Sequence, residues 1–148
     1  MTTEPTPALL SAANVRAFAL AGNATVTLES VKTGARFTFK IEAADDGGLH
    51  FVKVLTGADN ETDFAYLGTI RADRFAHGRK SKIGLDAPSA RAFAWAWPHL
   101  AAGSVPDALN VWHEGRCGRC NRKLTVPESI ASGFGPECSG RVAHLRAA

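Results

Sequence analysis

The chain of 148 residues is long enough for one compact domain, and with 45% hydrophobic and 21% charged residues it is not expected to be globally disordered. Its formal net charge is +3, and no apolar run reaches the roughly 18 residues that a membrane-spanning helix needs. The amino-terminal residues have no basic flank ahead of their apolar part, so we expect no secretory signal and a cytoplasmic protein with reduced thiols.

The first two thirds of the chain predict a small antiparallel sheet. Residues 1–7 are rich in Pro and Thr and are expected to be disordered, and the Ala/Leu-rich residues 8–21 predict a short helix that ends at Gly22. Apolar residues then recur at every second position, as in strands, and turn residues separate the segments. The predicted strands cover residues 26–30, 36–43, 49–56 and 63–70. Short loops imply a meander, and a fifth, weaker hairpin is expected over 73–84, with its turn at His77-Gly78.

A second helix is predicted at about residues 87–97. Pro88 suits the first turn, and Phe93, Ala96 and Trp97 fall on one apolar face. Pro98 is expected to end or kink this helix, because proline lacks the donor and disfavours the α conformation at the residue before it. Trp95 lies off the apolar face, where it could stack beside a cation or pack under the amino-terminal helix.

The last third of the chain carries a metal-binding pattern. Cys117 and Cys120 have the spacing of a zinc knuckle, in which a tight turn directs two thiolates at one ion. Asn121 directly after them tolerates the positive φ that such a turn requires. Cys138 follows a short predicted helix that Gly133 closes, and is itself expected in the first turn of a helix. Three clustered cysteines in a reducing compartment favour a tetrahedral zinc site over a disulfide, with three unpaired thiols as the alternative.

A closed zinc site needs a fourth ligand. His113 would complete an H-x3-C-x2-C-x17-C pattern and is the preferred candidate. His144 is the rival, although it lies six residues after Cys138 and is expected to point elsewhere on the same helix. A water molecule in the fourth position would leave the site open.

Positive charge is concentrated in two segments. Residues 113–148 hold six Lys/Arg and three Asp/Glu, which is the whole net charge, and residues 71–82 hold five basic residues against Asp73 alone. Solvated loops would explain these charges, and so would an anionic partner such as a nucleic acid. In that second case, the phosphate-binding residues are Arg116, Arg119, Arg122, Lys123 and Arg141 around the zinc site, and Arg74, Arg79, Lys80 and Lys82 on the basic hairpin.

The segment from Cys117 to Cys138 resembles the tail of a family of uncharacterised small proteins of bacteriophages, prophages and bacteria, with the pattern CxRCxRxLTxPESIxxGxGPxC. The resemblance covers about 30 residues strongly. It implies zinc binding by the three cysteines and a mobile-element setting, and it implies no activity.

Together these patterns predict an α+β fold: an antiparallel meander with one or two helices in residues 8–110, and a treble-clef-like zinc module in residues 111–148. No catalytic motif occurs, and no small-molecule substrate is evident, so we expect a non-catalytic protein of mobile-element origin that binds nucleic acid. The alternative is a protein-binding module, such as a phage factor that grips a host defence or transcription component. It would use Trp95, Trp112 and Phe134 as apolar anchors.

Overall fold

The computed structural model describes residues 8–12, 14–44, 48–57, 63–124, 127–135, 138 and 140. The stretch 1–7 that was expected to be disordered lies outside these ranges, as do Arg141 and His144. The strands are β1 (Ala8–Leu9), β2 (Asn23–Ser30), β3 (Arg36–Ala43), β4 (Leu49–Leu55), β5 (Phe64–Arg71), β6 (Arg74–His77) and β7 (Leu109–His113). The helices are α1 (Val15–Leu20), α2 (Pro88–Ala101) and α3 (Pro127–Ser132).

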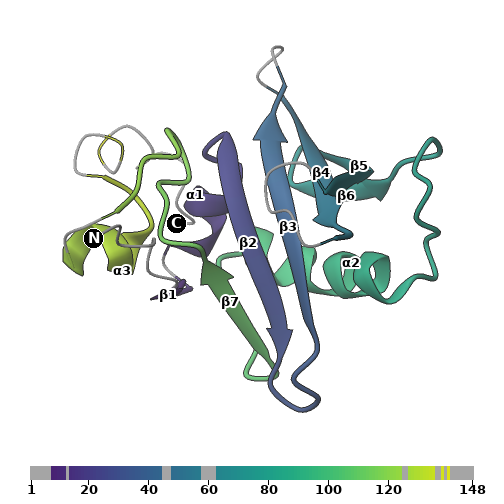
Figure 1. Ribbon diagram of the computed structural model, residues 1–148, viewed down its shortest axis with the longest axis horizontal. Coiled ribbons are helices and arrows are strands. Elements are labelled where there is room, and N and C mark those ends of the chain that lie inside the picture. The colour runs from purple at the N-terminus through teal and green to yellow at the C-terminus, as the bar shows by residue number, and fades with distance from the viewer. Residues whose placement is uncertain are drawn as a thin grey trace.

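Across the described residues, the strands form a seven-stranded sheet in the order β1-β7-β2-β3-β4-β5-β6 (Figure 1). Every neighbouring pair is antiparallel. Strands β2 to β6 follow one another as a meander, which confirms the predicted α+β class and the order of its central strands. None of the helices in the described ranges combines the length and the apolar character that crossing a bilayer demands.

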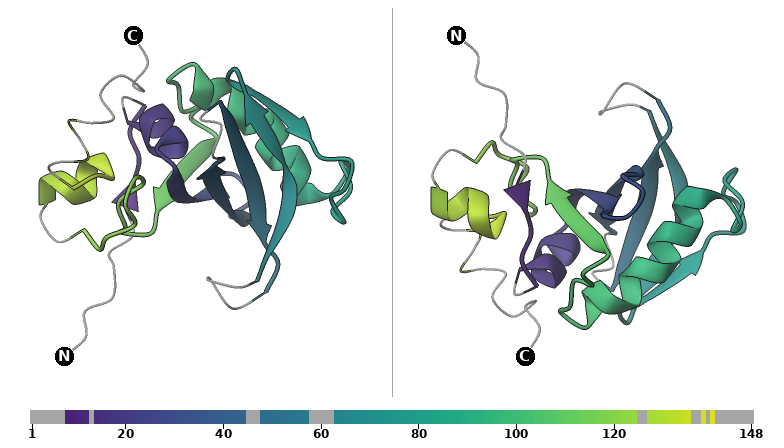
Figure 2. Two further views of the ribbon diagram at one scale, coloured as in Figure 1. Left: turned by 90° about the horizontal axis from the view of Figure 1, so that it is seen from above. Right: turned by 90° about the horizontal axis from the view of Figure 1, so that it is seen from below.

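The two faces of the sheet differ in what covers them. Phe39 and Ile41 of β3 are buried, and Phe39 packs against Phe93 of α2 with ring centroids 4.9 Å apart. On the same face, His50 of β4 contacts the Leu20 carbonyl at the end of α1. Helices α1 and α2 therefore lie on one side of the sheet (Figure 2). The other face carries the alternate residues of each strand, and we call it the open face. Its central residues are Thr27, Thr38, Lys40, Lys53 and Tyr66.

The β5–β6 hairpin turns earlier than the sequence predicts. Its turn residues are Ala72 and Asp73, with φ of 52° and 61°, and not His77-Gly78. Two consecutive residues with positive φ are typical of a two-residue hairpin loop. Alanine is not one of the residues favoured in such loops, so the sequence does not indicate a turn at this place. Distant contacts hold the turn: Arg16 bonds the Asp73 carboxylate at 2.8 Å, and the Trp97 indole N–H donates to the Asp73 carbonyl at 3.0 Å.

Helix α2 continues through Pro98 to Ala101, so the predicted end at residue 97 is wrong. Proline removes one helical hydrogen bond near the carboxyl end, and burial of Leu100 in the turn that follows favours continuing the helix. The predicted apolar face is confirmed, because Phe93, Ala96 and Trp97 are buried. Trp95 is 49% exposed, so it does not pack beneath α1.

The amino-terminal helix is shorter than predicted, because Ala8 and Leu9 form β1 opposite His113 and Trp112 of β7. The predicted metal segment includes residues 111–113 of β7, although Leu109, Val111 and His113 recur at every second position with Asn110 and Trp112 between them, as in a strand. Because β7 also pairs with β2, the boundary predicted between residues 110 and 111 falls inside this strand.

Candidate metal centre

The three cysteines come together in the structure. The sulfur atoms of Cys117, Cys120 and Cys138 all lie within 4.8 Å of one another, close enough to hold a metal ion as predicted. All three are free thiols. Cys117 and Cys138 are buried, whereas Cys120 is exposed at the surface.

A tight turn presents the first two thiols. The Asn121 N–H donates to the Cys117 carbonyl at 2.9 Å, and the Cys117 N–H donates to the Arg122 carbonyl at 2.8 Å. Asn121 has a φ of 64°, which agrees with the expectation that this residue takes the left-handed conformation. An isolated antiparallel bridge between Arg116 and Lys123 closes the turn, which we call the knuckle (residues 116–123).

The surroundings of the thiols favour charge on one sulfur and bring a cation to another. Burial raises the pKa of the Cys117 thiol, but N–H groups of Cys120, Gly135 and Arg119 outweigh it, so this pKa lies below the ordinary value. Burial raises the pKa of Cys138, and the Arg119 guanidinium, whose Nη1 lies 3.6 Å from Cys138 Sγ, partly offsets that effect. Arg119 is thus a neighbour of the sulfur cluster itself.

The knuckle is docked on the sheet and on α1. The Gly118 carbonyl accepts the Asn23 N–H at 2.8 Å, and the Asn23 side chain donates to the Arg119 carbonyl at 2.8 Å. A Cβ atom at Gly118 would lie 2.8 Å from the Phe18 ring, so the glycine lets the turn approach α1 closely. Phe18 is a residue of this site that sequence reasoning missed, because no local pattern distinguishes it from any other core phenylalanine.

Phe18 joins the knuckle to the segment that follows α3. Its ring centroid lies 5.5 Å from that of His113 and 5.8 Å from that of Phe134. The Gly133 carbonyl accepts the Gly118 N–H at 3.0 Å, which ties the two halves of the metal segment together. The metal segment therefore shares one hydrophobic core with the sheet.

His113 does not join the sulfur cluster. Among the described residues, the group that could hold a metal contains the three cysteines alone. The imidazole is fully buried. Its Nδ1 accepts the Gly115 N–H at 2.8 Å, and its Nε2 lies 2.5 Å from the Ile130 carbonyl. Burial lowers the pKa of His113, and only the bond to Ile130 opposes this shift, so the ring is neutral with its proton on Nε2. In this structure, His113 links β7 to α3.

The basic residues fall into separate groups. Arg116, Arg122 and Lys123 are exposed on the knuckle, and Arg116 Nη1 donates to the Asn121 carbonyl at 3.3 Å. Arg74 lies on β6, and Arg79, Lys80 and Lys82 are exposed in the loop between β6 and α2. This loop and the metal segment lie at opposite ends of the molecule (Figure 1), so the two basic segments do not form one patch.

Residues 111–143 match the model of a family of unknown function, DUF6011. The match begins in β7 and spans all three cysteines, so it identifies an uncharacterised domain around the candidate metal centre. It covers less than half of the chain. No curated protein and no solved structure is detectably similar to this protein.

Proposed function

We propose that Cys117, Cys120 and Cys138 bind one structural zinc ion in a treble-clef-like module. The observation that carries this proposal is the grouping of three thiol sulfurs within 4.8 Å. Zinc–sulfur bonds of about 2.3 Å in a tetrahedron place sulfur atoms about 3.8 Å apart, so small side-chain movements would suffice to close the site. A knuckle followed by a third thiolate beyond a short helix supports the treble-clef-like arrangement. A reducing compartment, such as the cytoplasm, belongs to this proposal because the ligands are thiolates.

The fourth ligand of this zinc ion is either a water molecule or His144, because both ring nitrogens of His113 already have partners. Metal analysis of protein purified without chelator tests the site. One zinc per chain is expected, and the Cys138→Ser variant should lose most of it, whereas the Ser132→Ala variant should not. Less than a tenth of an equivalent in the wild type would refute the site. Cobalt(II) substitution then reports the ligand set, and an unchanged spectrum in His144→Ala would point to water.

We further propose that the protein is non-catalytic, comes from a mobile element and binds nucleic acid through the knuckle. The support is the +3 charge of residues 113–148 and the exposure of Arg116, Arg122 and Lys123. Arg119 has a different role in this proposal, since its guanidinium neutralises the Cys138 thiolate. Arg141 lies outside the described residues.

A salt titration of binding tests the knuckle. Each lost phosphate contact should lower the slope of log affinity against log salt by about 0.9 for a duplex or about 0.7 for a single strand. The double variant Arg116→Gln/Arg122→Gln should therefore lose one to two units of slope and keep its zinc. Arg91→Gln, an exposed position on α2, is the matched control. Equal slopes in both variants would refute phosphate binding by the knuckle.

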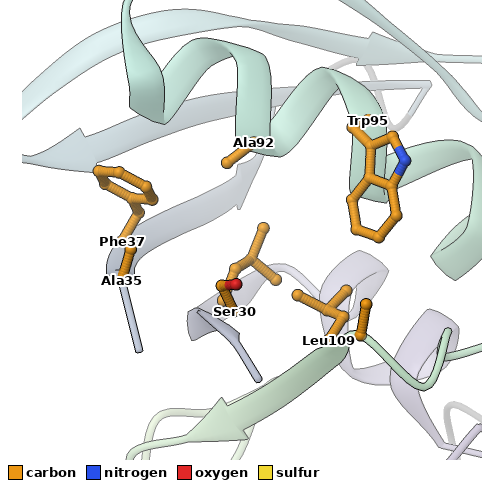
Figure 3. A pocket seen from close by; sticks show the side chains of 8 residues that line it. Ser30, Ala35, Phe37, Ala92, Trp95 and Leu109 are labelled. Carbon is orange, nitrogen blue, oxygen red and sulfur yellow. The ribbon is translucent and has the colours of Figure 1, made fainter. Parts of the chain in front are cut away.

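One observation favours protein binding as a second candidate. Of the three expected anchors, Phe134 is buried and the Trp112 indole N–H donates to Glu29, but Trp95 is 49% exposed. Trp95 forms one wall of an apolar pocket of about 200 Å³ between α2 and the β2–β3 hairpin, with Phe37 on the opposite wall (Figure 3). Ala92→Leu would fill this pocket, whereas Ala94→Leu on the exposed side of α2 would not. If a protein partner binds the two variants with equal affinity, that partner does not use the pocket.

A further inference from the structure

The three thiols of the candidate metal centre differ in their contact with solvent. Cys117 is 1% exposed and Cys138 is 6% exposed, whereas Cys120 lies at the surface. The two residues that follow Cys120 on the knuckle, Asn121 and Arg122, are exposed as well. A dissolved oxidant reaches an exposed thiol more readily than a buried one. The cluster therefore presents one sulfur to solvent, with two buried sulfurs beside it.

Both buried sulfurs are close enough to Cys120 to form a disulfide with it. All three sulfur atoms lie within 4.8 Å of one another. An S–S bond is about 2.05 Å long, so either pair must close by less than about 3 Å. An oxidised sulfur on Cys120 would thus have two thiols next to it, which is the arrangement of a reactive cysteine beside a resolving one.

The knuckle favours Cys117 as the partner of Cys120. The two cysteines belong to one turn, which is closed by the bond from the Asn121 N–H to the Cys117 carbonyl at 2.9 Å. A disulfide within this turn closes a loop of four residues, whereas one with Cys138 closes a loop of 19 residues. A short loop whose ends the backbone already holds together loses less entropy when it is closed. Cys138 lies instead against Arg119, whose Nη1 is 3.6 Å from its sulfur.

We infer that Cys120 is an oxidation site and that a peroxide joins it to Cys117 in a disulfide. First, the Cys120 thiol takes one oxygen from hydrogen peroxide as the O–O bond breaks, which gives a sulfenic acid and one water. The Cys117 sulfur then attacks the Cys120 sulfur, the S–O bond breaks, and the oxygen leaves as a second water with the Cys117 thiol proton. The two thiols lose two electrons in all, and the peroxide gains them.

The disulfide would remove two of the three thiolates that the proposed zinc ion needs, so the ion should leave. This release rests on the proposed zinc site, whereas the disulfide itself needs only the thiols. The bond from the Gly118 N–H to the Gly133 carbonyl and the packing of Phe134 on Phe18 involve no sulfur, so both should persist. Oxidation should therefore free Cys138 from the knuckle and leave the sheet folded. The thiol reductants of a reducing compartment would reverse the change.

Trypsin separates the three cysteines, which makes their pairing directly measurable. It cleaves after Lys and Arg, and the peptides that carry Cys117, Cys120 and Cys138 are 117–119, 120–122 and 124–141, respectively. The full chain is treated with hydrogen peroxide, the remaining thiols are blocked, and the digest is analysed by mass spectrometry. We expect peptide 117–119 linked to peptide 120–122, and one zinc released to a chelating dye for each link formed. A dithiol should then break the link.

A trapping reagent and two matched variants identify the sulfur that reacts first. A dione that captures sulfenic acids should mark peptide 120–122. Cys120→Ser and Cys138→Ser each remove one thiol from the cluster, but only the first removes the exposed thiol. Cys138→Ser should still link peptides 117–119 and 120–122. Cys120→Ser should lose its remaining thiols to peroxide at least about tenfold more slowly, because both are buried.

The outcomes separate this inference from the zinc proposal. The expected link, with the dione on peptide 120–122, supports the inference. A main product that joins peptide 124–141 to either of the others overturns the pairing, and a dione found first on a peptide other than 120–122 overturns the site. Equal rates of thiol loss in Cys120→Ser and Cys138→Ser overturn it as well. Less than a tenth of an equivalent of zinc before peroxide is added refutes the zinc site alone, because the disulfide is read from the peptides.

Discussion

The close approach of the metal segment to α1 can be tested with two glycines that share a backbone conformation. Gly133 and Gly34 have φ of +85° and +74°, so alanine is strained at both. At Gly34 nothing lies within 4 Å of the added Cβ atom, whereas at Gly133 that atom would lie 2.5 Å from Cδ2 of Phe18. The pair therefore separates backbone strain from the contact between the metal segment and α1.

The expected magnitudes follow from that geometry. The left-handed conformation costs alanine about 1–2 kcal/mol, which is the whole effect at Gly34. At Gly133 the Phe18 ring must also move by about 1 Å to restore an ordinary carbon–carbon distance, and overpacking of this kind costs a further 1–3 kcal/mol or so. For a chain of this size, 1 kcal/mol corresponds to about 2–4 °C, so Gly133→Ala should melt at least about 2 °C below Gly34→Ala.

Thermal unfolding with saturating zinc measures this difference, and competition with a chelating dye measures zinc affinity. Gly133→Ala should also release zinc more readily, because the Gly133 carbonyl accepts a hydrogen bond from Gly118 in the knuckle. Gly34→Ala lies in the β2–β3 turn and should leave zinc affinity unchanged. Equal melting temperatures for the two variants would mean that the Phe18 ring can move aside without a cost in stability. The packing of α1 against the metal segment would then not hold the site together.

Three further predictions follow from the same site and its sheet. The His113 ring should show a protonated Nε2 and a bare Nδ1 in ¹⁵N spectra. Because burial lowers its pKa below the ordinary 6.5, the stability that it contributes should be complete above that value and fall below it, by at most about 1.4 kcal/mol per pH unit. A ¹⁵N chemical shift typical of a metal-bound ring nitrogen would contradict this assignment. Arg119→Gln should weaken zinc retention more than Arg122→Gln, because only the Arg119 guanidinium lies against Cys138. If the two variants lose zinc to a chelator with the same half-time, Arg119 does not have that role. Glu29→Ala should lower the melting temperature more than Glu42→Ala, because Glu29 accepts bonds from Asn110 and Trp112 as well as pairing with Arg36. A larger fall in melting temperature for Glu42→Ala would show that the bonds from Asn110 and Trp112 to Glu29 do not stabilise the fold.

Local patterns in the sequence predicted those parts of the fold that local physics determines. The bounds of β3 could be predicted to the residue because its apolar and polar positions alternate without a break. The grouping of the cysteines and the left-handed conformation of Asn121 could likewise be predicted from neighbouring residues. The turn at Ala72-Asp73 was not, because contacts from α1 and α2, distant in the chain, hold it in place.

The role of His113 shows the same limit within the site. Its spacing from Cys117 suits a zinc ligand, and nothing nearby in the sequence shows that Gly115 and the Ile130 carbonyl occupy both ring nitrogens. Likewise, the position of β7 between β1 and β2 depends on partners about 100 and about 85 residues earlier in the chain.

That position has a consequence for how the protein is made. During synthesis from the amino terminus, β2 to β6 and both helices of the core emerge before β7, so the meander can begin to fold first. Until residues 109–113 leave the ribosome, one edge of β2 has unpaired backbone groups and β1 has no neighbour to hold it. The last strand to arrive also leads directly into the cysteines. Docking of β7 would therefore protect an aggregation-prone edge and deliver the thiols to α1 in a single late step of folding.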